Sequence, residues 1–168
     1  MGKELIDLVD KNDKIIGVTD VEAAHRLKQF HRVVGIFVFD DSKCVYLQKE
    51  NKYNRYDCSV GGHVRTGESP DEAACRELLE ELALEIPLTK ISTFLAQNSQ
   101  LNHIWSLYEG KAPTGWQFKK TREVKAIEKL RLDDLVDLIS TRPEKFTQGL
   151  INTLREYIRV KGLTVHLF

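Results

Sequence analysis

Acidic side chains gather near the middle of the chain at spacings that suit metal chemistry. Glu77, Glu80 and Glu81 are three, four and one residues apart, so a helix would place them on one face, where like charges repel. A bound cation would relieve that repulsion, and Mg²⁺ and Mn²⁺ prefer oxygen ligands such as carboxylates. The alternative is an acidic face that contacts only solvent. No lysine alternates with these glutamates, and Glu68 leads into the same helix from a glycine-bearing loop, so we favour a divalent-metal site.

The helix that must carry these carboxylates has a clear start. Ser69 and Glu72 are the two members of a capping box, with Pro70 at the first helical position, so the helix begins directly after a loop at residues 61–68. At about 100° per residue, the glutamates and the apolar side chains occupy separate arcs. We expect one face to be carboxylate and the other to be core, the core face comprising Cys75, Leu78, Leu79 and Leu82.

The remaining elements are strands and helices in no regular alternation. Residues 5–20 predict a hairpin, and Thr19 with Glu22 predicts a capping box for a helix that carries His25. A second hairpin is expected at 32–40 and 43–50, further strands at 91–97, 103–110 and 123–132, and helices at 132–140 and 143–161. Without βαβ repeats, the pattern favours an α/β fold of the α+β type, a mixed β-sheet sandwiched between helices.

Composition limits the class of protein. The chain has 168 residues, with no repeat or linker, which indicates a single domain over residues 1–168. The 25 basic and 25 acidic residues cancel, so charge gives no reason to expect a nucleic-acid polymer or a membrane surface as partner. Three scattered cysteines and the lack of a long apolar run or signal peptide indicate a soluble, cytoplasmic protein. The sequence leaves open whether the chain forms a homodimer.

The acidic segment resembles the Nudix box, whose pattern is G, five residues, E, seven residues, then REUxEExGU with U aliphatic. The match spans residues 62–84, and the one departure is Ala83, where the family has glycine. A Cβ at a left-handed helix end costs about 1–2 kcal/mol, so we expect a strained C-cap there. The matching positions are Gly62, Glu68, Arg76, Glu77, Leu78, Glu80, Glu81 and Leu84.

Residues 22–50, 56–68 and 142–150 resemble the isopentenyl-diphosphate-isomerase-like branch of Nudix proteins, which contains isomerases and hydrolases. In the isomerases, a catalytic cysteine precedes the first glycine of the box, whereas this chain has Gly61 there and Cys58 three residues upstream. His103 stands near the position of the isomerases' later acidic residue. Both departures favour a hydrolase over an isomerase.

The resemblance implies roles for the box residues. A Mg²⁺ or Mn²⁺ ion would bridge and neutralise the substrate's diphosphate. Glu77 and Glu123 are both candidates for the general base, and Arg76 would hold a carboxylate in place. Glu68 would be either a ligand or the partner of Arg76. The implied metal ligands are Glu77, Glu80 and Glu81, with Glu68 and a carbonyl of Gly61 or Gly62.

Histidines and basic residues outside the box leave alternatives open. His25, His31 and His63 match positions that bind a second metal in the isomerases, and His103 is a candidate fourth ligand. We favour the other interpretation, hydrogen-bonded histidines lining a polar pocket. Lys49, Lys52 and Arg55, in a loop before the box, are weak candidates for phosphate contact. Aromatic residues could stack on a base, but we expect them in the core; they are Tyr53, Tyr56, Trp105 and Trp116.

The function that we expect is Mg²⁺-dependent hydrolysis of a diphosphate linkage in a nucleoside diphosphate derivative or a similar small metabolite. The alternatives are isopentenyl-diphosphate isomerase and a Nudix domain that only senses a ligand. The intact acidic triad favours an enzyme over a sensor, because an unoccupied acidic cluster would be electrostatically costly.

Overall fold

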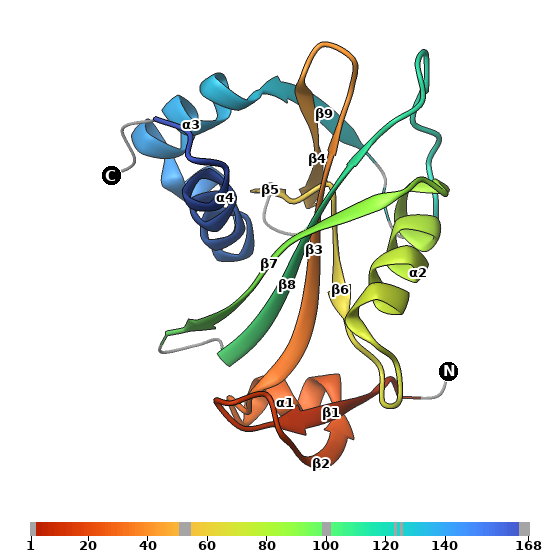
Figure 1. Cartoon of the computed structure of the whole chain (residues 1–168), viewed down its shortest axis with the longest axis vertical. Helices are drawn as coiled ribbons and strands as arrows, with labels where there is room; N and C mark the ends of the chain where they lie inside the picture. The colour runs from red at the N-terminus through yellow and green to blue at the C-terminus, as the bar shows by residue number, and fades with distance from the viewer. Residues whose placement is uncertain (1–2, 51–54, 99–101, 123, 125, 165–168) are drawn as a thin grey trace.

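The computed structural model describes residues 3–50, 55–98, 102–122, 124 and 126–164 (Figure 1). Its strands are β1 (Leu5–Val9), β2 (Ile15–Asp20), β3 (His31–Phe39), β4 (Cys44–Glu50), β5 (Arg55–Asp57), β6 (Val60–His63), β7 (Leu88–Gln97), β8 (Asn102–Lys111) and β9 (Ile127–Arg131). Its helices are α1 (Val21–Arg26), α2 (Pro70–Leu82), α3 (Leu132–Thr141) and α4 (Gln148–Lys161), with a short 3₁₀ turn η1 (Pro143–Lys145). None of these described helices is both long and apolar enough to cross a membrane.

Strand β3 is the centre of the sheet. It pairs antiparallel with β6 and parallel with β8, while β8 pairs antiparallel with β7 and β4 pairs with β5 and β9. Helix α2 covers one face of this mixed sheet, and α3 and α4 lie on the other side (Figure 1). The predicted mixed sheet between helices is therefore confirmed.

Alternation along β3 explains why its sequence is an almost continuous apolar run. Val34, Ile36 and Val38 are buried in the cluster that includes α2, whereas Phe37 is buried in the cluster that includes α4. A strand covered on both faces needs apolar side chains at nearly every position. This burial fixes the register of β3, and with it the places of the polar residues at its ends.

Several local predictions are confirmed. The hairpin β1–β2, the β3–β4 hairpin, and strands β7, β8 and β9 form where expected. Ser69 and Glu72 complete both hydrogen bonds of the capping box of α2, with proline at its start. Ala83 has φ 51° and ψ 40°, the left-handed C-cap that the sequence indicated.

Other local predictions are wrong for identifiable reasons. Asp20, not Thr19, caps α1, because its carboxylate accepts from the amide of Ala23. The predicted helix at 143–161 is divided into η1 and α4, since Thr147 caps a new start at Gln148.

The core face of α2 also differs from its prediction. Cys75 and Leu79 are exposed, while Leu78 and Leu82 are buried as expected. Ala73, Ala74 and the two glutamates Glu77 and Glu81 complete the buried face, so the sheet side of α2 is partly acidic. The helix therefore directs carboxylates toward β6 rather than away from the protein.

Candidate active site

The glycine-rich strand β6 separates two groups of functional side chains. The sequence predicted a loop at residues 61–68, but Val60–His63 pair with β3, so the first part of that segment is strand. A Cβ on Gly62 would overlap the carboxyl group of Glu77, so only glycine allows α2 to approach this closely. Successive residues of a strand point to opposite faces, and His63 therefore faces away from α2.

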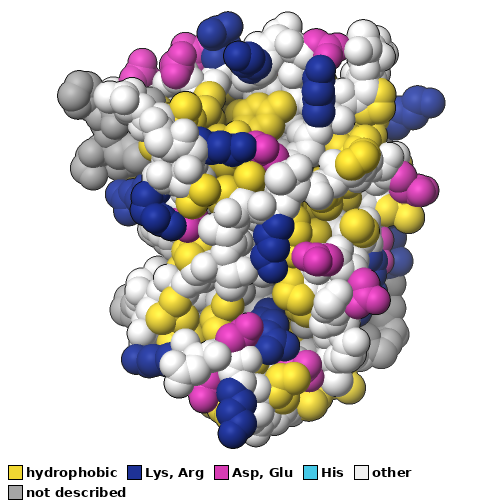
Figure 2. Space-filling view, viewed as in Figure 1, with side chains coloured by type: hydrophobic (Ala, Val, Ile, Leu, Met, Phe, Trp, Pro, Cys, Tyr) yellow, Lys and Arg dark blue, Asp and Glu magenta, His cyan; other side chains and the backbone are white. Residues whose placement is uncertain are grey.

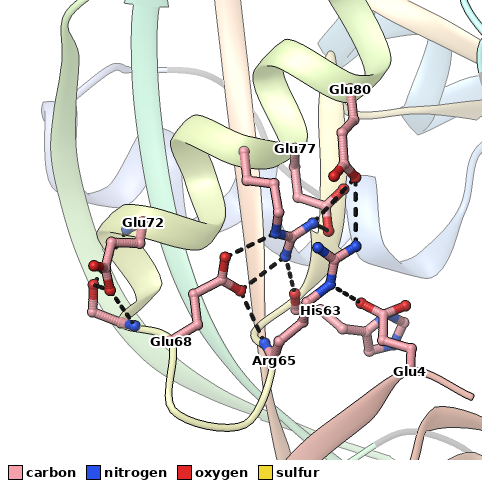
Figure 3. A network of polar contacts seen from close by, with 9 residues as sticks. Glu4, His63, Arg65, Glu68, Glu72, Glu77 and Glu80 are labelled. Carbon is pink, nitrogen blue, oxygen red and sulfur yellow. Dashed lines mark hydrogen bonds and ion pairs between the residues drawn. The ribbon is translucent and has the colours of Figure 1, made fainter.

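Arg76 lies within ion-pair distance of three acidic residues of the box. Figure 3 shows the network to which Glu68, Glu77 and Glu80 belong. Its Nε and Nη2 donate to Glu68 Oε1 and Oε2 at 2.8 and 2.9 Å, a bidentate pair. Its Nη1 lies 2.7 Å from Glu77 Oε1 and 3.3 Å from Glu80 Oε2. Charge repulsion among these glutamates is thus relieved by the guanidinium, and repulsion alone does not require a metal.

The contacts of Arg76 agree with the structural role expected for it. Both oxygens of Glu68 are engaged by the guanidinium, and Oε2 also accepts from the Arg65 amide, so Glu68 is placed as the partner of Arg76. Arg76 Nη2 additionally donates to the carbonyl of His63 at 2.9 Å. The same guanidinium therefore ties the loop, the helix and the end of β6 together.

The carboxyl groups of this network have different electrostatic environments. Hydrogen bonds from Arg76 are the main reason that the pKa of Glu68 lies below its usual value. Desolvation raises the pKa of Glu77, despite the opposing effect of Arg76. Glu77 is only 6% exposed, whereas the Glu80 side chain is 36% exposed and also lies 3.6 Å from Arg65 Nη2. Glu77 is thus the carboxylate whose charge is most costly to maintain without a cation.

Glu81 is held by a separate set of donors. Its Oε2 accepts from Gln48 Nε2 on β4 at 2.5 Å and from the amide of Gly61 at 3.2 Å. Glu81 is 9% exposed, so these bonds satisfy a buried charge. Gln48 was missed by sequence reasoning, because no local pattern connects a strand residue with a helix residue 33 positions later.

Four histidines meet on the opposite face of the sheet. In the parallel pairing of β3 with β8, His31 is opposite His103, and in the antiparallel pairing with β6, Val33 is opposite His63. Helix α1 adds His25, whose Nε2 lies 3.1 Å from His63 Nε2. The ring centroids of His31 and His103 are 4.5 Å apart. The ring centroid of His25 lies 5.0 to 5.6 Å from those of the other three histidines, and those of His31 and His63 are 5.4 Å apart.

The histidine cluster lacks the hydrogen bonds that pocket-lining histidines should have. His31 Nδ1 contacts the carbonyl of Gln29 at 2.8 Å, but His31 Nε2 and both ring nitrogens of His103 are buried with no hydrogen-bond partner among the described residues. Desolvation lowers the pKa of His31 to about 4 and the pKa values of His63 and His103 to about 3. The rings are therefore neutral at pH 7, the form that binds metals.

Both regions have donor sets that fit a metal, but of different kinds. Each of His25, His31 and His63 offers one nitrogen, and these three atoms lie within 4.8 Å of one another, an arrangement suited to zinc or another metal that accepts imidazole. His103 does not belong to this close group, although its ring lies beside it. The box glutamates offer only oxygen, which suits Mg²⁺ or Mn²⁺.

Other predicted site residues lie elsewhere. Lys49 and Arg55 are on strands β4 and β5 rather than in a loop, and alternation along β4 directs Lys49 away from the face that bears Gln48. Lys49 Nζ lies 3.8 Å from Glu128 Oε1 and over the ring of Tyr56. The structure does not bring Lys49 to the box carboxylates. Glu123, Lys52 and Tyr53 lie outside the described residues.

The two described tryptophans pack against other aromatic residues. Trp105 is 8% exposed and packs beside Phe94, and Trp116 is half-buried with its ring edge-on to Tyr46. The expectation that these aromatics belong to the core agrees with their positions. Tyr56 is half-buried and donates to Glu128 at 2.7 Å.

Cys58 cannot replace a missing cysteine at Gly61. It is buried in the cluster of α4 and β3, with its sulfur 3.2 Å from the hydroxyl of Thr153, and desolvation raises its pKa. All three cysteines are free thiols. At Gly61 itself, an added Cβ would meet only the carbonyl oxygen of Val34, at 3.8 Å, so the position has room for a side chain but has none.

Comparisons with known proteins extend the likeness beyond the acidic helix. Residues 29–151 match the NUDIX domain family. An isopentenyl-diphosphate Delta-isomerase from Serratia proteamaculans is 30% identical over 167 residues, covering 91% of this chain and 90% of that protein. A prenyl-diphosphate phosphatase from Methanosarcina mazei is 26% identical over 164 residues, covering 90% and 96%. The crystal structure of DR0079 from Deinococcus radiodurans, 25% identical, covers 90% and 97% with a TM-score of 0.76.

Proposed function

The chain belongs to the NUDIX family, in which enzymes generally use divalent metals, and on that premise we propose that it hydrolyses a diphosphate linkage in a small molecule with Mg²⁺ or Mn²⁺. The predicted resemblance, including its isopentenyl-diphosphate-isomerase-like branch, is confirmed by these relatives. One observation carries the proposed function: α2 buries the carboxylates of Glu77 and Glu81 against the glycines of β6. Burying two carboxylates is costly, so their retention favours a use for them.

The proposed roles follow from the positions of the side chains. Glu77, Glu80 and Glu81, with a carbonyl of Gly61 or Gly62, would hold the metal. When bound, a divalent ion neutralises diphosphate oxygens and lowers the pKa of a bound water. Arg76 is a positioning residue, because it contacts Glu77 and Glu80 while Glu68 fixes its guanidinium.

Glu77 is the candidate general base among the described residues, a role that it would take as an alternative to ligating the metal. Desolvation raises its pKa, which makes its carboxylate a better proton acceptor than an exposed one. Its closeness to Gly62 places it beside the backbone that would approach the substrate. Glu123, the other candidate, lies outside the described residues and stays a proposal from the resemblance.

The isomerase alternative lacks a proton donor at the expected position. Gly61 has no side chain, and the buried thiol of Cys58 is within hydrogen-bond distance of the Thr153 hydroxyl. Moving a proton to an alkene requires a well-placed acid, whereas hydrolysis of a diphosphate requires at this position only a backbone that the substrate can approach. These features support a hydrolase even though a relative is named as an isomerase.

The substrate class is proposed from chemistry and from the relatives' names. Both named relatives act on prenyl diphosphates according to those names, and one of them is a phosphatase. Trp105 is buried, and Trp116 is half-buried in contact with Tyr46 and Phe118. We therefore place short prenyl diphosphates first and nucleoside diphosphate derivatives second.

We also propose that the histidine cluster binds a second metal ion. The unpartnered nitrogens of His31 and His103 support this over the pocket interpretation, because buried polar atoms normally have partners. His25, His31 and His63 would be the ligands, and His103 would join them after a rotation of its side chain. An imidazole set favours zinc over magnesium.

The test is a panel of prenyl and nucleoside diphosphates incubated with Mg²⁺, with release of phosphate and formation of allylic product both measured. We expect release of phosphate or a monophosphate from at least one diphosphate, and no allylic product from isopentenyl diphosphate. Glu77→Gln should slow release by at least about 100-fold, since it removes a base or a ligand.

Glu85→Gln is the matched control, because Glu85 is an exposed glutamate just beyond the same helix. It should retain the full rate. Isomerisation as fast as the best hydrolysis would overturn the hydrolase assignment, and inactivity in both assays would favour a ligand-sensing domain.

A further inference from the structure

The side chain of Gln48 joins three segments around one carboxylate. Its Nε2 donates to the backbone carbonyl of Ser59 at 2.9 Å and to Glu81 Oε2 at 2.5 Å. Both protons of the amide group are therefore used, one on the chain just before β6 and one on α2. The opposite orientation of the amide would place its oxygen against two acceptors, so the hydrogen-bond network fixes which way this side chain points.

We propose that Gln48 is a positioning residue that orients the carboxylate of Glu81 for the divalent ion of the proposed hydrolase, and this inference rests on that proposed function. A ligating carboxylate works best when its other contacts fix its rotamer, and hydrogen bonds to an ionised group are among the strongest available. The amide of Gly61 donates to the same oxygen. Two amides, both uncharged, thus donate to Glu81 Oε2.

The position of Gln48 in the sheet explains how it reaches Glu81. Its neighbours in sequence, Leu47 and Lys49, point to the face of α3 and α4, where Leu47 is fully buried. Gln48 points to the other face, and its partner across the β4–β5 ladder is Asp57. Ser59, whose carbonyl accepts the second proton, also fixes the local backbone, since its hydroxyl accepts from Val38 and donates to Tyr46.

This arrangement differs from that of Glu77 and Glu80. Those carboxylates are held by Arg76, a cation that competes with a metal for the same oxygens. Among the contacts described for the Glu81 carboxylate, the amides of Gln48 and Gly61 donate to Oε2 and so orient it. We therefore infer that Gln48 prepares Glu81 to bind a divalent ion.

Calorimetric titration with Mg²⁺ tests the inference without any substrate. Gln48→Met keeps the length of the side chain but removes both donated hydrogen bonds. We expect its Mg²⁺ affinity to fall roughly 10–100-fold, the usual effect of losing a residue that orients a metal ligand. Gln97→Met, the same change at an exposed strand position, should leave the affinity unchanged.

The dependence of hydrolysis on Mg²⁺ gives a second readout that a purely structural role would not move. In Gln48→Met, excess Mg²⁺ should restore most of the rate, because the ligand is present but poorly oriented. In Glu81→Gln, where the ligand itself is lost, excess Mg²⁺ should not restore it. Thermal unfolding of each variant identifies any that fail to fold.

The outcomes separate this inference from the function on which it rests. Unchanged Mg²⁺ affinity in folded Gln48→Met, alongside lost binding in Glu81→Gln, would overturn the role of Gln48 alone. Unchanged affinity in Glu81→Gln would overturn the metal site, and with it the proposed function. A loss in Gln48→Met that excess Mg²⁺ cannot restore would show that Gln48 acts on the fold rather than on the ligand.

Discussion

The carboxylate network of α2 and the histidine cluster lie on opposite faces of β6 and differ in how their polar atoms are satisfied. The carboxylates of Glu68, Glu77 and Glu80 all contact Arg76. In the histidine cluster, three ring nitrogens are buried without a partner among the described residues. In the first region the protein itself supplies a cation to the carboxylates, whereas in the second region ring nitrogens are left for a ligand.

The two regions also depend differently on their surroundings. The network is built almost entirely from residues 62–84, so helix geometry and one loop are sufficient to assemble it. The histidines come from α1, β3, β6 and β8 and meet only after the sheet has formed. The face of the molecule shown in Figure 2 carries basic and acidic side chains interspersed with apolar ones.

The largest effect on stability is expected from removing the cation of the network. Arg76→Ala leaves Glu68 and Glu77 without their partner, and breaking a largely buried ion pair costs about 3 kcal/mol of unfolding free energy. Urea denaturation measures this loss. Mg²⁺ should restore part of it, because an ion would replace the guanidinium.

Lys3→Ala removes the cation of an exposed ion pair with Asp20 and should change stability little. If Arg76→Ala cost no more than Lys3→Ala, the carboxylates would not depend on an internal cation, and the contrast with the histidine cluster would fail.

Zinc should stabilise the protein through the histidine cluster. At a free concentration 100 times its dissociation constant, a ligand that binds only the folded state adds about 2.7 kcal/mol. His63→Ala should abolish this gain and leave Mg²⁺ affinity intact, while Glu81→Gln should do the reverse. The exposed thiol of Cys75 is replaced by serine throughout, to exclude zinc binding there. Loss of both metals in either variant would mean that the two regions act as one site.

Stability of the metal-free protein should fall as pH decreases below about 6.5. The folded-state pKa values of His31, His63 and His103 lie at about 3 to 4, below the ordinary value of 6.5, so the unfolded state binds protons first. Between its folded-state pKa and about 6.5, each buried histidine can change the free energy of unfolding by up to about 1.4 kcal/mol per pH unit. Replacing His103 by glutamine should reduce the slope measured by urea denaturation between pH 6.5 and 4.5. An unchanged slope would contradict neutral burial of these rings.

The smallest effect concerns the C-cap of α2. Ala83 has φ 51°, so Ala83→Gly should stabilise the protein by about 1 kcal/mol through relief of strain. The mirror change, Gly162→Ala at the C-cap of α4 with φ 63°, should destabilise it by a similar amount. Thermal denaturation measures both. A change in Mg²⁺ affinity on Ala83→Gly would show that this cap also positions the carboxylates.

The sequence by itself determined the features that depend on neighbours along the chain. The capping box at Ser69 follows from spacing within one helix, because residues three or four positions apart must meet on its surface. The left-handed C-cap at Ala83 and the role of Arg76 are expected from the resemblance of the same segment to the Nudix box. The β-rich run at residues 32–40 likewise predicted a strand, and β3 forms there.

Only the tertiary structure decided which distant residues meet. Strand β6 has a sequence of low β-propensity and forms because β3 supplies its hydrogen bonds, which in turn directs Gly62 and His63 to opposite faces. The contact of Gln48 with Glu81 and the meeting of His31 with His103 depend on strand register. Register is set by burial of apolar side chains across the whole sheet, and no local spacing contains that information.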